Sequence, residues 1–134
     1  MLVKYKIGSG AYTLLFDESA GDANEKFAPT FRDRVMPVPG YGAPSVTQVP
    51  MANTEGEITF KYNKVYSSAD NATAAIATLR STFKGVQLHL QVTVGATVVY
   101  FPYAVLTASS HDQSNVNVTH SLTFKTADIT TTSP

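Results

Sequence analysis

One stretch of the chain has the hydrophobic spacing of a helix. In residues 67–85, apolar or small side chains recur at Ala72, Ala75, Ile76, Leu79 and Phe83. A recurrence of about three to four residues makes one helical face. Ser67 and Asp70 resemble a capping box at the start of this stretch. The pattern predicts a helix over about residues 68–84 that covers a sheet. The face of this helix that packs on the sheet is predicted to be Ala72, Ile76, Leu79 and Phe83.

Most other apolar positions alternate with polar ones, which is the pattern of half-buried strands. The alternation is cleanest in residues 87–94, where the polar set is Gln87, His89, Gln91 and Thr93. The predicted strands are 2–7, 11–16, 31–36, 56–65, 86–94, 97–107 and 115–129. Runs of strands with a lone helix predict a mainly β (α+β) fold: an antiparallel β-sandwich or barrel with a single flanking α-helix.

The connections between these strands are predicted from turn residues. Gly8-Ser9-Gly10 and Gly95-Ala96 predict hairpin turns. Residues 17–30 and 109–114 are polar and predict loops, and the tail 130–134 is expected to fray. Pro102 cannot donate a ladder hydrogen bond, so its strand is predicted to be an edge strand, bulged, or bent there.

A long Pro/Gly-rich segment, residues 37–55, interrupts the strands. Its prolines and glycines predict an arm without regular structure. Its apolar residues set it apart from a solvated linker. We therefore expect an ordered arm that contacts a partner through Pro37, Val38, Pro39, Tyr41, Val46, Val49 and Met51.

Composition narrows the class of protein. The 134 residues predict a single domain. Lys plus Arg and Asp plus Glu number 10 each, so the formal net charge is zero, which argues against a protein that grips nucleic acid and favours self-association. The sequence has no cysteine, no secretory signal pattern and no apolar run long enough to span a bilayer. Synthesis in a cytoplasm, without a membrane partner, is the expectation.

The residues that carry chemistry form no strong constellation. His89 and His120 fall on strand faces of opposite character, so we do not expect a shared metal site. For His120, a hydrogen-bonded histidine in a sheet is the expectation. Ser110-His111-Asp112 are adjacent, whereas a catalytic triad converges from different segments. Asp17, Glu18 and Asp22 lack the spacing of a calcium loop. No catalytic residue, metal or cofactor is predicted.

The order of elements resembles that of bacteriophage tail structural proteins: tail-tube, distal-tail and related tail-ring proteins. The resemblance rests on residues 34–40 (RVMPVPG), which are similar to the arginine-then-VPG segment of distal-tail proteins, and on the strands and helix that follow. It covers residues 31–129. Distal-tail proteins tend to continue VPG with Arg-Asp-Gly, whereas Tyr41-Gly42 follow here, so the subfamily stays open.

The resemblance implies a non-enzymatic virion structural protein. It would be a homo-oligomer, a hexameric or similar ring that stacks with other rings and other tail proteins into a channel for transient, non-specific passage of DNA. The polar row Gln87, His89, Gln91 and Thr93 would line the lumen. The protein would be located in the virion tail after assembly in the cytoplasm of a bacterial host. The alternative is a carbohydrate-binding or adhesion β-sandwich module, which the absence of Trp disfavours.

Overall fold

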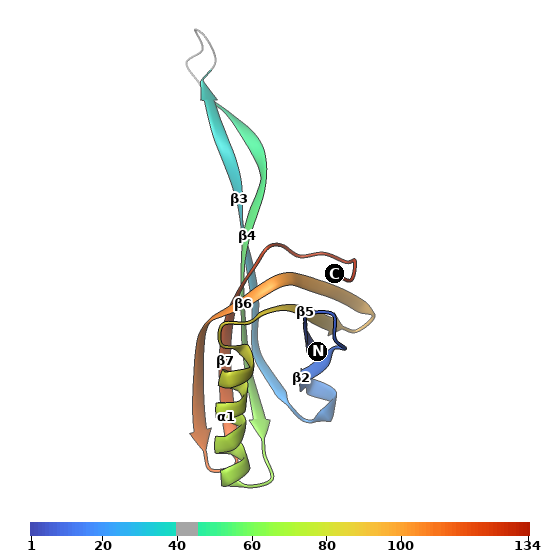
Figure 1. Ribbon diagram of the computed structural model, residues 1–134, viewed down its shortest axis with the longest axis vertical. Helices are drawn as coiled ribbons and strands as arrows, with labels where there is room; N and C mark the ends of the chain where they lie inside the picture. The colour runs from blue at the N-terminus through green and yellow to red at the C-terminus, as the bar shows by residue number, and fades with distance from the viewer. Residues whose placement is uncertain (40–45) are drawn as a thin grey trace.

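The computed structural model describes residues 1–39 and 46–134, which form one seven-stranded antiparallel sheet with one α-helix (Figure 1). Neighbouring strands follow the order β2-β1-β5-β6-β7-β4-β3. In chain order the elements are β1 (Leu2–Ile7), β2 (Thr13–Asp17), the 3-10 turn η1 (Glu18–Ala20), β3 (Ala23–Pro39), β4 (Val46–Val65), α1 (Ala69–Phe83), β5 (Gln87–Val94), β6 (Thr97–Ser114) and β7 (Asn117–Thr126). The predicted fold class is confirmed.

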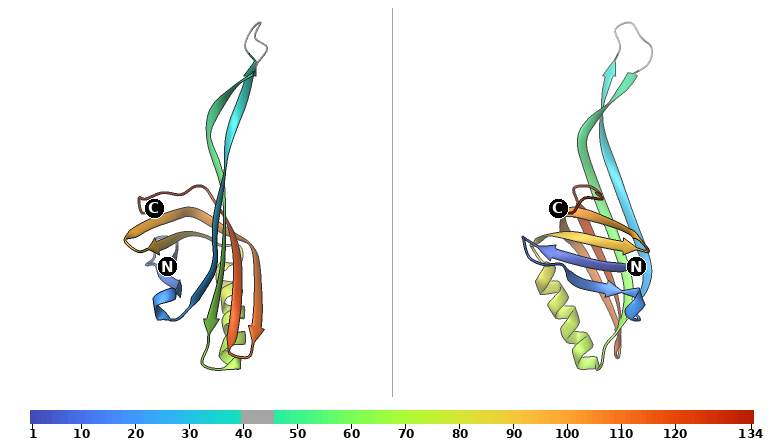
Figure 2. Two further views of the ribbon diagram at one scale, coloured as in Figure 1. Left: turned by 180° about the vertical axis from the view of Figure 1, so that it is seen from behind. Right: turned by 90° about the vertical axis from the view of Figure 1, so that its right-hand side faces the viewer.

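The sheet folds over itself because β6 belongs to both of its halves. The first part of β6 pairs with β5, and the later part pairs with β7. The backbone bends at Tyr103, where φ is 53°, next to Pro102 and shortly before the pairing passes from β5 to β7. The pairing with β5 shifts register at this bend, and the pairing with β7 shifts register between Leu106 and Ala108. Pro102 therefore lies at a bend in a central strand, and Figure 2 shows β5 and β6 crossing over the other half of the sheet.

The folded sheet has two layers: the first contains β2, β1, β5 and the first part of β6, and the second contains the rest of β6, β7, β4 and β3. Aromatic rings join these two layers. Phe16 of β2 stacks on Tyr62 of β4 with ring centroids 4.3 Å apart. Phe101 of β6 lies near Phe27 and Phe31 of β3, at 6.1 Å and 6.5 Å. Burying rings of this size is the largest favourable contribution that such a core offers. The core cluster comprises Val3, Leu15, Phe16, Ile58, Phe60, Tyr62, Phe83, Leu88, Leu90, Val92, Phe101, Ala104, Leu106, Leu122 and Phe124.

The N-cap of helix α1 lies one residue later than predicted. Ser68 is the N-cap, and its side-chain oxygen accepts a hydrogen bond from the backbone N–H of Asn71 at 3.1 Å. The capping box predicted for Ser67 and Asp70 is therefore wrong, although Asp70 lies in the first turn, where the helix dipole favours a negative charge. Among residues 1–39 and 46–134, no helix has the length and apolar character needed to cross a membrane.

The helix closes the open side of the folded sheet. Of the predicted packing face, Ala72 and Phe83 are buried, and Ile76 and Leu79 are partly buried. The ring of Phe83 lies edge-on to Tyr5 of β1 at 4.8 Å and to Phe124 of β7 at 5.8 Å. One side chain of α1 thus contacts both layers.

Two predicted loops form regular elements in the structure. Residues 17–30 contain η1 and the start of β3, and residues 109–114 continue β6. Both were predicted as loops because their polar side chains show no hydrophobic period, but ladder pairing with β4 and β7 holds them as strands. The tail is also tied down, because Thr130 and Tyr100 exchange backbone hydrogen bonds of 2.7 Å and 2.9 Å.

Gly56 stands where the β3–β4 hairpin leaves the sandwich. It is the last residue of β4 in this direction to pair with β7, opposite Thr126. A Cβ atom on Gly56 would lie 2.8 Å from Cγ2 of Thr126 and 3.0 Å from the ring of Phe31. The absence of a side chain at this position therefore lets β7 and the Phe31 ring meet over the backbone of β4.

We expect Gly56→Ala to lower the free energy of unfolding by about 1–3 kcal/mol, because buried neighbours must shift to admit the methyl group. Urea denaturation measures this loss. Gly10→Ala is the matched control, because its new methyl group would meet only the Ile7 carbonyl oxygen, at 3.4 Å. Adding Thr126→Ser removes the clashing Cγ2 and should recover part of the loss. Equal losses at Gly56 and Gly10 would contradict this explanation.

Candidate functional site

The most prominent feature outside the sandwich is a two-stranded ribbon. Beyond Asp33 and Thr54, which face one another, β3 and β4 pair only with each other and project along the long axis of the molecule (Figure 1). We call this ribbon the extended hairpin; its described residues are 35–39 and 46–54. Pairing continues out to Pro39 and Val46. The prediction that residues 37–55 lack regular structure is therefore wrong for the residues described.

The pairing register explains why prolines do not break the ribbon. Pro37 faces Gln48, Pro39 faces Val46, and Pro50 faces Val35, so the prolines occupy alternate pairs of the ladder. In an antiparallel ladder, alternate residues direct their N–H groups away from the partner strand. Proline at such positions sacrifices no ladder bond and removes a donor from the outer edge. The edges of the extended hairpin are therefore poor templates for adding another strand.

The extended hairpin exposes several large apolar side chains to solvent. The exposed large side chains are Val35 (52%), Met36 (49%), Val38 (38%), Val49 (37%) and Met51 (46%). Residues 35–54 include no charged residue. An isolated two-stranded ribbon is marginally stable in water, and clustered exposed apolar residues are typical of interaction surfaces. The composition of the extended hairpin thus favours contact with another apolar surface.

The predicted contact residues of the arm fall largely on this ribbon. Pro37, Val38, Val49 and Met51 are exposed on it, and the backbones of Pro39 and Val46 pair near its described end. Tyr41 lies outside the described residues. That these residues form an interface stays a prediction.

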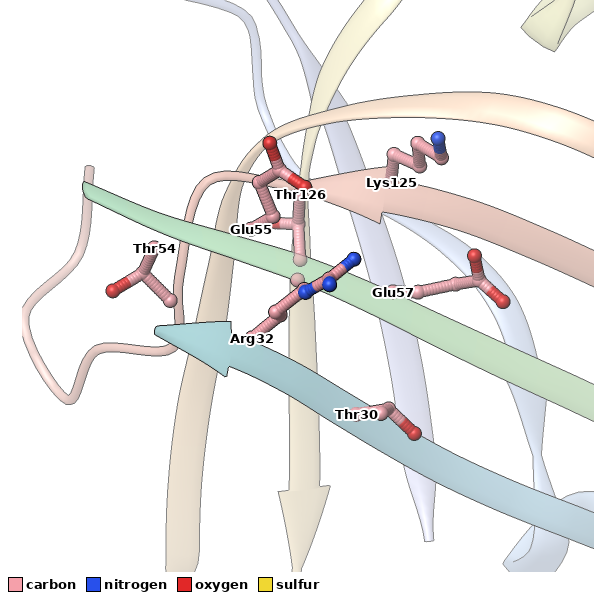
Figure 3. Close-up of a pocket in the computed structure, with 8 residues that line it drawn as sticks. Thr30, Arg32, Thr54, Glu55, Glu57, Lys125 and Thr126 are labelled. Atoms are coloured by element: carbon pink, nitrogen blue, oxygen red, sulfur yellow. The ribbon is translucent and has the colours of Figure 1, made fainter. Parts of the chain in front are cut away.

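Charged residues gather at the base of the extended hairpin. A depression of about 570 Å³ lies there, lined by charged side chains of β3, β4 and β7 (Figure 3). Arg32 and Lys125 balance Glu55 and Glu57. Glu55 accepts a hydrogen bond from Arg34, and this contact holds the pKa of the Glu55 carboxyl below its usual range. Asp33 offsets the charge of Arg34, so the base has no excess charge for an ionic ligand.

The polar row on β5 lies on the outer surface of the first layer. Gln87, His89, Gln91 and Thr93 alternate with Leu88, Leu90 and Val92, which are buried. On the neighbouring β1, Lys4 pairs opposite Gln91 and Lys6 opposite His89, so the surface around the row carries positive charge. Burial and the charge of Lys6 lower the pKa of His89. Whether this row lines a lumen stays a prediction.

A buried polar cluster lies on the inner face of β7. His120 is buried, with Nε2 2.9 Å from the Tyr66 hydroxyl and Nδ1 2.7 Å from Nδ1 of His111 on β6. The expectation of a hydrogen-bonded sheet histidine is confirmed, whereas Tyr66 and His111 were missed as its partners. Burial, and then the charges of His111 and Lys64, lower the pKa of His120 to about 4.

The other residues with potential chemistry stay apart. His89 lies on the outer surface of the first layer and His120 in the core of the second. Ser110, His111 and Asp112 are consecutive in β6, so the serine and aspartate point to the opposite face from the histidine. Among the described residues, no group of three or more His, Cys, Asp or Glu side chains is placed to hold a metal ion.

The acidic residues of the η1 turn have structural contacts. Asp17 accepts hydrogen bonds from the backbone and hydroxyl of Ser19 at 3.0 Å and 2.7 Å. Glu18 pairs with the amino terminus at 3.4 Å, and Asp22 pairs with Lys64 at 3.9 Å. These carboxylates cap and anchor the turn between the two layers.

Comparison with known proteins yields matches of structure. No protein-family model and no curated protein sequence matches the chain. A chain in the tail of an empty gene transfer agent particle with C6 symmetry has a TM-score of 0.57 at 16% identity, covering 98% of this chain and 95% of that chain. A chain in the virion of a native gene transfer agent particle has a TM-score of 0.54 at 14% identity, covering 94% and 91%. The predicted likeness to tail proteins is confirmed at the level of the fold.

The histidine cluster makes stability depend on pH. From about pH 6.5 down to about pH 4, the unfolded chain binds a proton at residue 120 that the folded chain does not. We therefore expect stability to be full above about pH 6.5 and to fall as the pH decreases towards 4. Urea midpoints at several pH values across this window measure the effect.

His120→Phe should flatten this pH dependence and also lower stability at neutral pH, because the Tyr66 hydroxyl loses its partner. His89→Gln is the control: it changes the group that accepts from the Tyr103 N–H, so it should lower stability across the pH range and keep most of the pH dependence. A wild-type midpoint that does not change across the window would contradict the assignment.

Proposed function

We propose that the chain is a non-enzymatic structural subunit of a phage-like tail. The observation that carries the proposal is the match in fold along 98% of this chain and 95% of a chain from a gene transfer agent tail. On this proposal the chain acts as one domain within a virion tail that assembles in a bacterial cytoplasm.

Copies of the chain form a ring, hexameric or similar, in this proposal. The C6 symmetry of the tail that contains the structural neighbour supports this ring order. The balanced charges of the chain support it as well, because neutral subunits pack side by side without net repulsion. Stacked rings then enclose a channel for transient, non-specific passage of DNA. The row Gln87, His89, Gln91 and Thr93 is our candidate for the channel wall.

The extended hairpin joins successive rings in this proposal. Its length and its position beyond the sandwich suit a contact with the next ring (Figure 1). Its uncharged, apolar side chains support a protein partner over DNA, because binding to phosphates requires Lys or Arg. Copies of the same chain and other tail proteins are the partners it would meet.

The carbohydrate-binding alternative receives less support. Stacking on sugar rings requires a row of exposed aromatic side chains. Among the described residues, Tyr103 is the one aromatic ring in the exposed large hydrophobic set, at 56% exposed. Most other aromatic rings of the sandwich pack in or against the core, and Tyr12, Tyr66 and Tyr100 are half-buried. A single exposed ring offers no platform for an oligosaccharide.

We expect the purified protein to form rings or tubes, visible by negative-stain electron microscopy, and the protein to be present in virions by mass spectrometry.

Deleting residues 37–51 should abolish stacking and leave a folded domain, because Asp33 and Thr54 still face one another and can close a short hairpin. Unfolding of the deletion variant would place these residues in the core instead. A protein that stays monomeric at high concentration and is absent from virions would overturn the proposal.

Point substitutions make a gentler test of the same contact. Val38→Asp adds a charge to the extended hairpin, and Val94→Asp adds the same charge at an exposed position of β5, where Val94 is 52% exposed and Val38 is 38% exposed. We expect Val38→Asp to prevent stacking and Val94→Asp to keep it, with both variants as stable as the wild type. Loss of stacking in both would assign the effect to net charge.

A further inference from the structure

A groove, which we call the α1–β2 groove, runs between α1, the β1–β2 hairpin and the end of β4. Its volume is about 360 Å³, and Leu14 of β2, which is 46% exposed, lies on one side of it. Helix α1 contributes Ala74, Ala75 and Thr78 on the other side, and these small side chains keep the groove open. The space is too small for a strand pair and suits a few inserted side chains.

The groove has almost no charge. Lys64 is the one charged residue that lines it in the described part of the chain, and Lys64 is paired with Asp22 at 3.9 Å. The remaining lining combines aliphatic and tyrosine side chains with a threonine and asparagine rim. An occupant that fits this lining has apolar side chains and brings no charge that would need a partner.

The extended hairpin has the properties that the groove requires. Its exposed valines and methionines have no cover within the described chain, and residues 35–54 carry no charge. The hairpin cannot reach the groove of its own chain, because it projects from one end of the long axis while α1 lies toward the other (Figures 1 and 2). The groove of a second copy is therefore the surface available to it.

We infer that the extended hairpin of one copy docks into the α1–β2 groove of another copy. The contact uses two different surfaces at opposite ends of the molecule, so it is heterologous and places the copies head to tail. Head-to-tail placement is the direction in which rings stack, and in this respect the inference rests on the proposed function. It assigns the receptor for the hairpin, which the proposed function leaves open. Met36 and Val38 are the side chains best placed to enter, since they lie near the described end of the ribbon.

Disulfide trapping tests the contact directly, because the chain has no cysteine of its own. A Met36→Cys variant is mixed with an Ala74→Cys variant that carries a different mass tag, under mild oxidation. The matched control replaces Ala74→Cys with Ala77→Cys, which is also exposed on the same helix but lies outside the groove. We expect mixed dimers, counted by mass spectrometry, at several-fold higher yield with Ala74→Cys. Equal yields would overturn the inference, as would a preference for Ala74-to-Ala74 dimers, which would indicate groove-to-groove contact.

Blocking the groove separates this inference from the proposed function. Ala74→Arg fills the groove with a charged side chain, and Ala77→Arg places the same side chain elsewhere on α1; arginine favours a helix at both positions. We expect Ala74→Arg to raise the concentration needed for stacking by about tenfold or more, and Ala77→Arg to leave it unchanged. Stacking that is lost in Val38→Asp but kept in Ala74→Arg would overturn the groove while the proposed function stands. A wild type that neither stacks nor cross-links would overturn both.

Discussion

The bend of β6 at Pro102 and Tyr103 decides where every other strand lies. A positive φ at a residue other than glycine is unfavourable. It is held here by Thr126, whose hydroxyl donates to the Pro102 carbonyl at 2.6 Å, and by His89, whose Nδ1 accepts from the Tyr103 N–H at 3.2 Å. Because β6 turns away at this point, one half of the sheet lies over the other and the aromatic core is enclosed. A straight β6 would leave both faces of the sheet in water.

The same bend creates the extended hairpin. Strand β7 stops at Thr126, and the chain after it follows β6 as far as the Thr130–Tyr100 pair. Beyond Gly56, β4 therefore has only β3 beside it. The extended hairpin is therefore the part of the β3–β4 pair that continues after β7 has ended. Its exposure follows from the fold itself, and no separate element had to be added to form it.

Charge divides the β3–β4 hairpin into two parts with different partners. At the base, Arg32, Arg34, Glu55 and Glu57 neutralise one another and keep that surface in water. Farther out there is no charge to desolvate, and the prolines remove edge donors. Adding a strand to the edge requires backbone N–H groups, which proline lacks. The outer part of the hairpin must therefore contact a partner through its side chains. Contact through side chains also demands a shaped receptor, which explains why a groove matters more than an open sheet edge.

Sequence periodicity predicted the elements that have one buried face and one exposed face. Helix α1 and strand β5 were found in this way, because each has one face in the core. The extended hairpin was missed because a segment with many prolines is normally predicted to be irregular. Only the alternate spacing of these prolines in the β3–β4 ladder indicates a ribbon. The Tyr66–His120–His111 cluster was beyond prediction, because strand register places His111 opposite His120 and no local pattern encodes it. The α1–β2 groove could not be predicted either, because it forms between segments that are far apart in the sequence.

Docking of one hairpin into one groove would bury too little surface to hold two copies together for long, since stable interfaces bury about 1,200–2,000 Å². A closed ring changes this balance. When one hairpin of a ring has docked, the others are held near their own grooves, and each further contact forms as an intramolecular step. Weak single contacts thus become a stable junction only between complete rings. Such a subunit would close laterally before it stacks, and free copies would not elongate into single-file chains, although each carries both halves of the longitudinal contact.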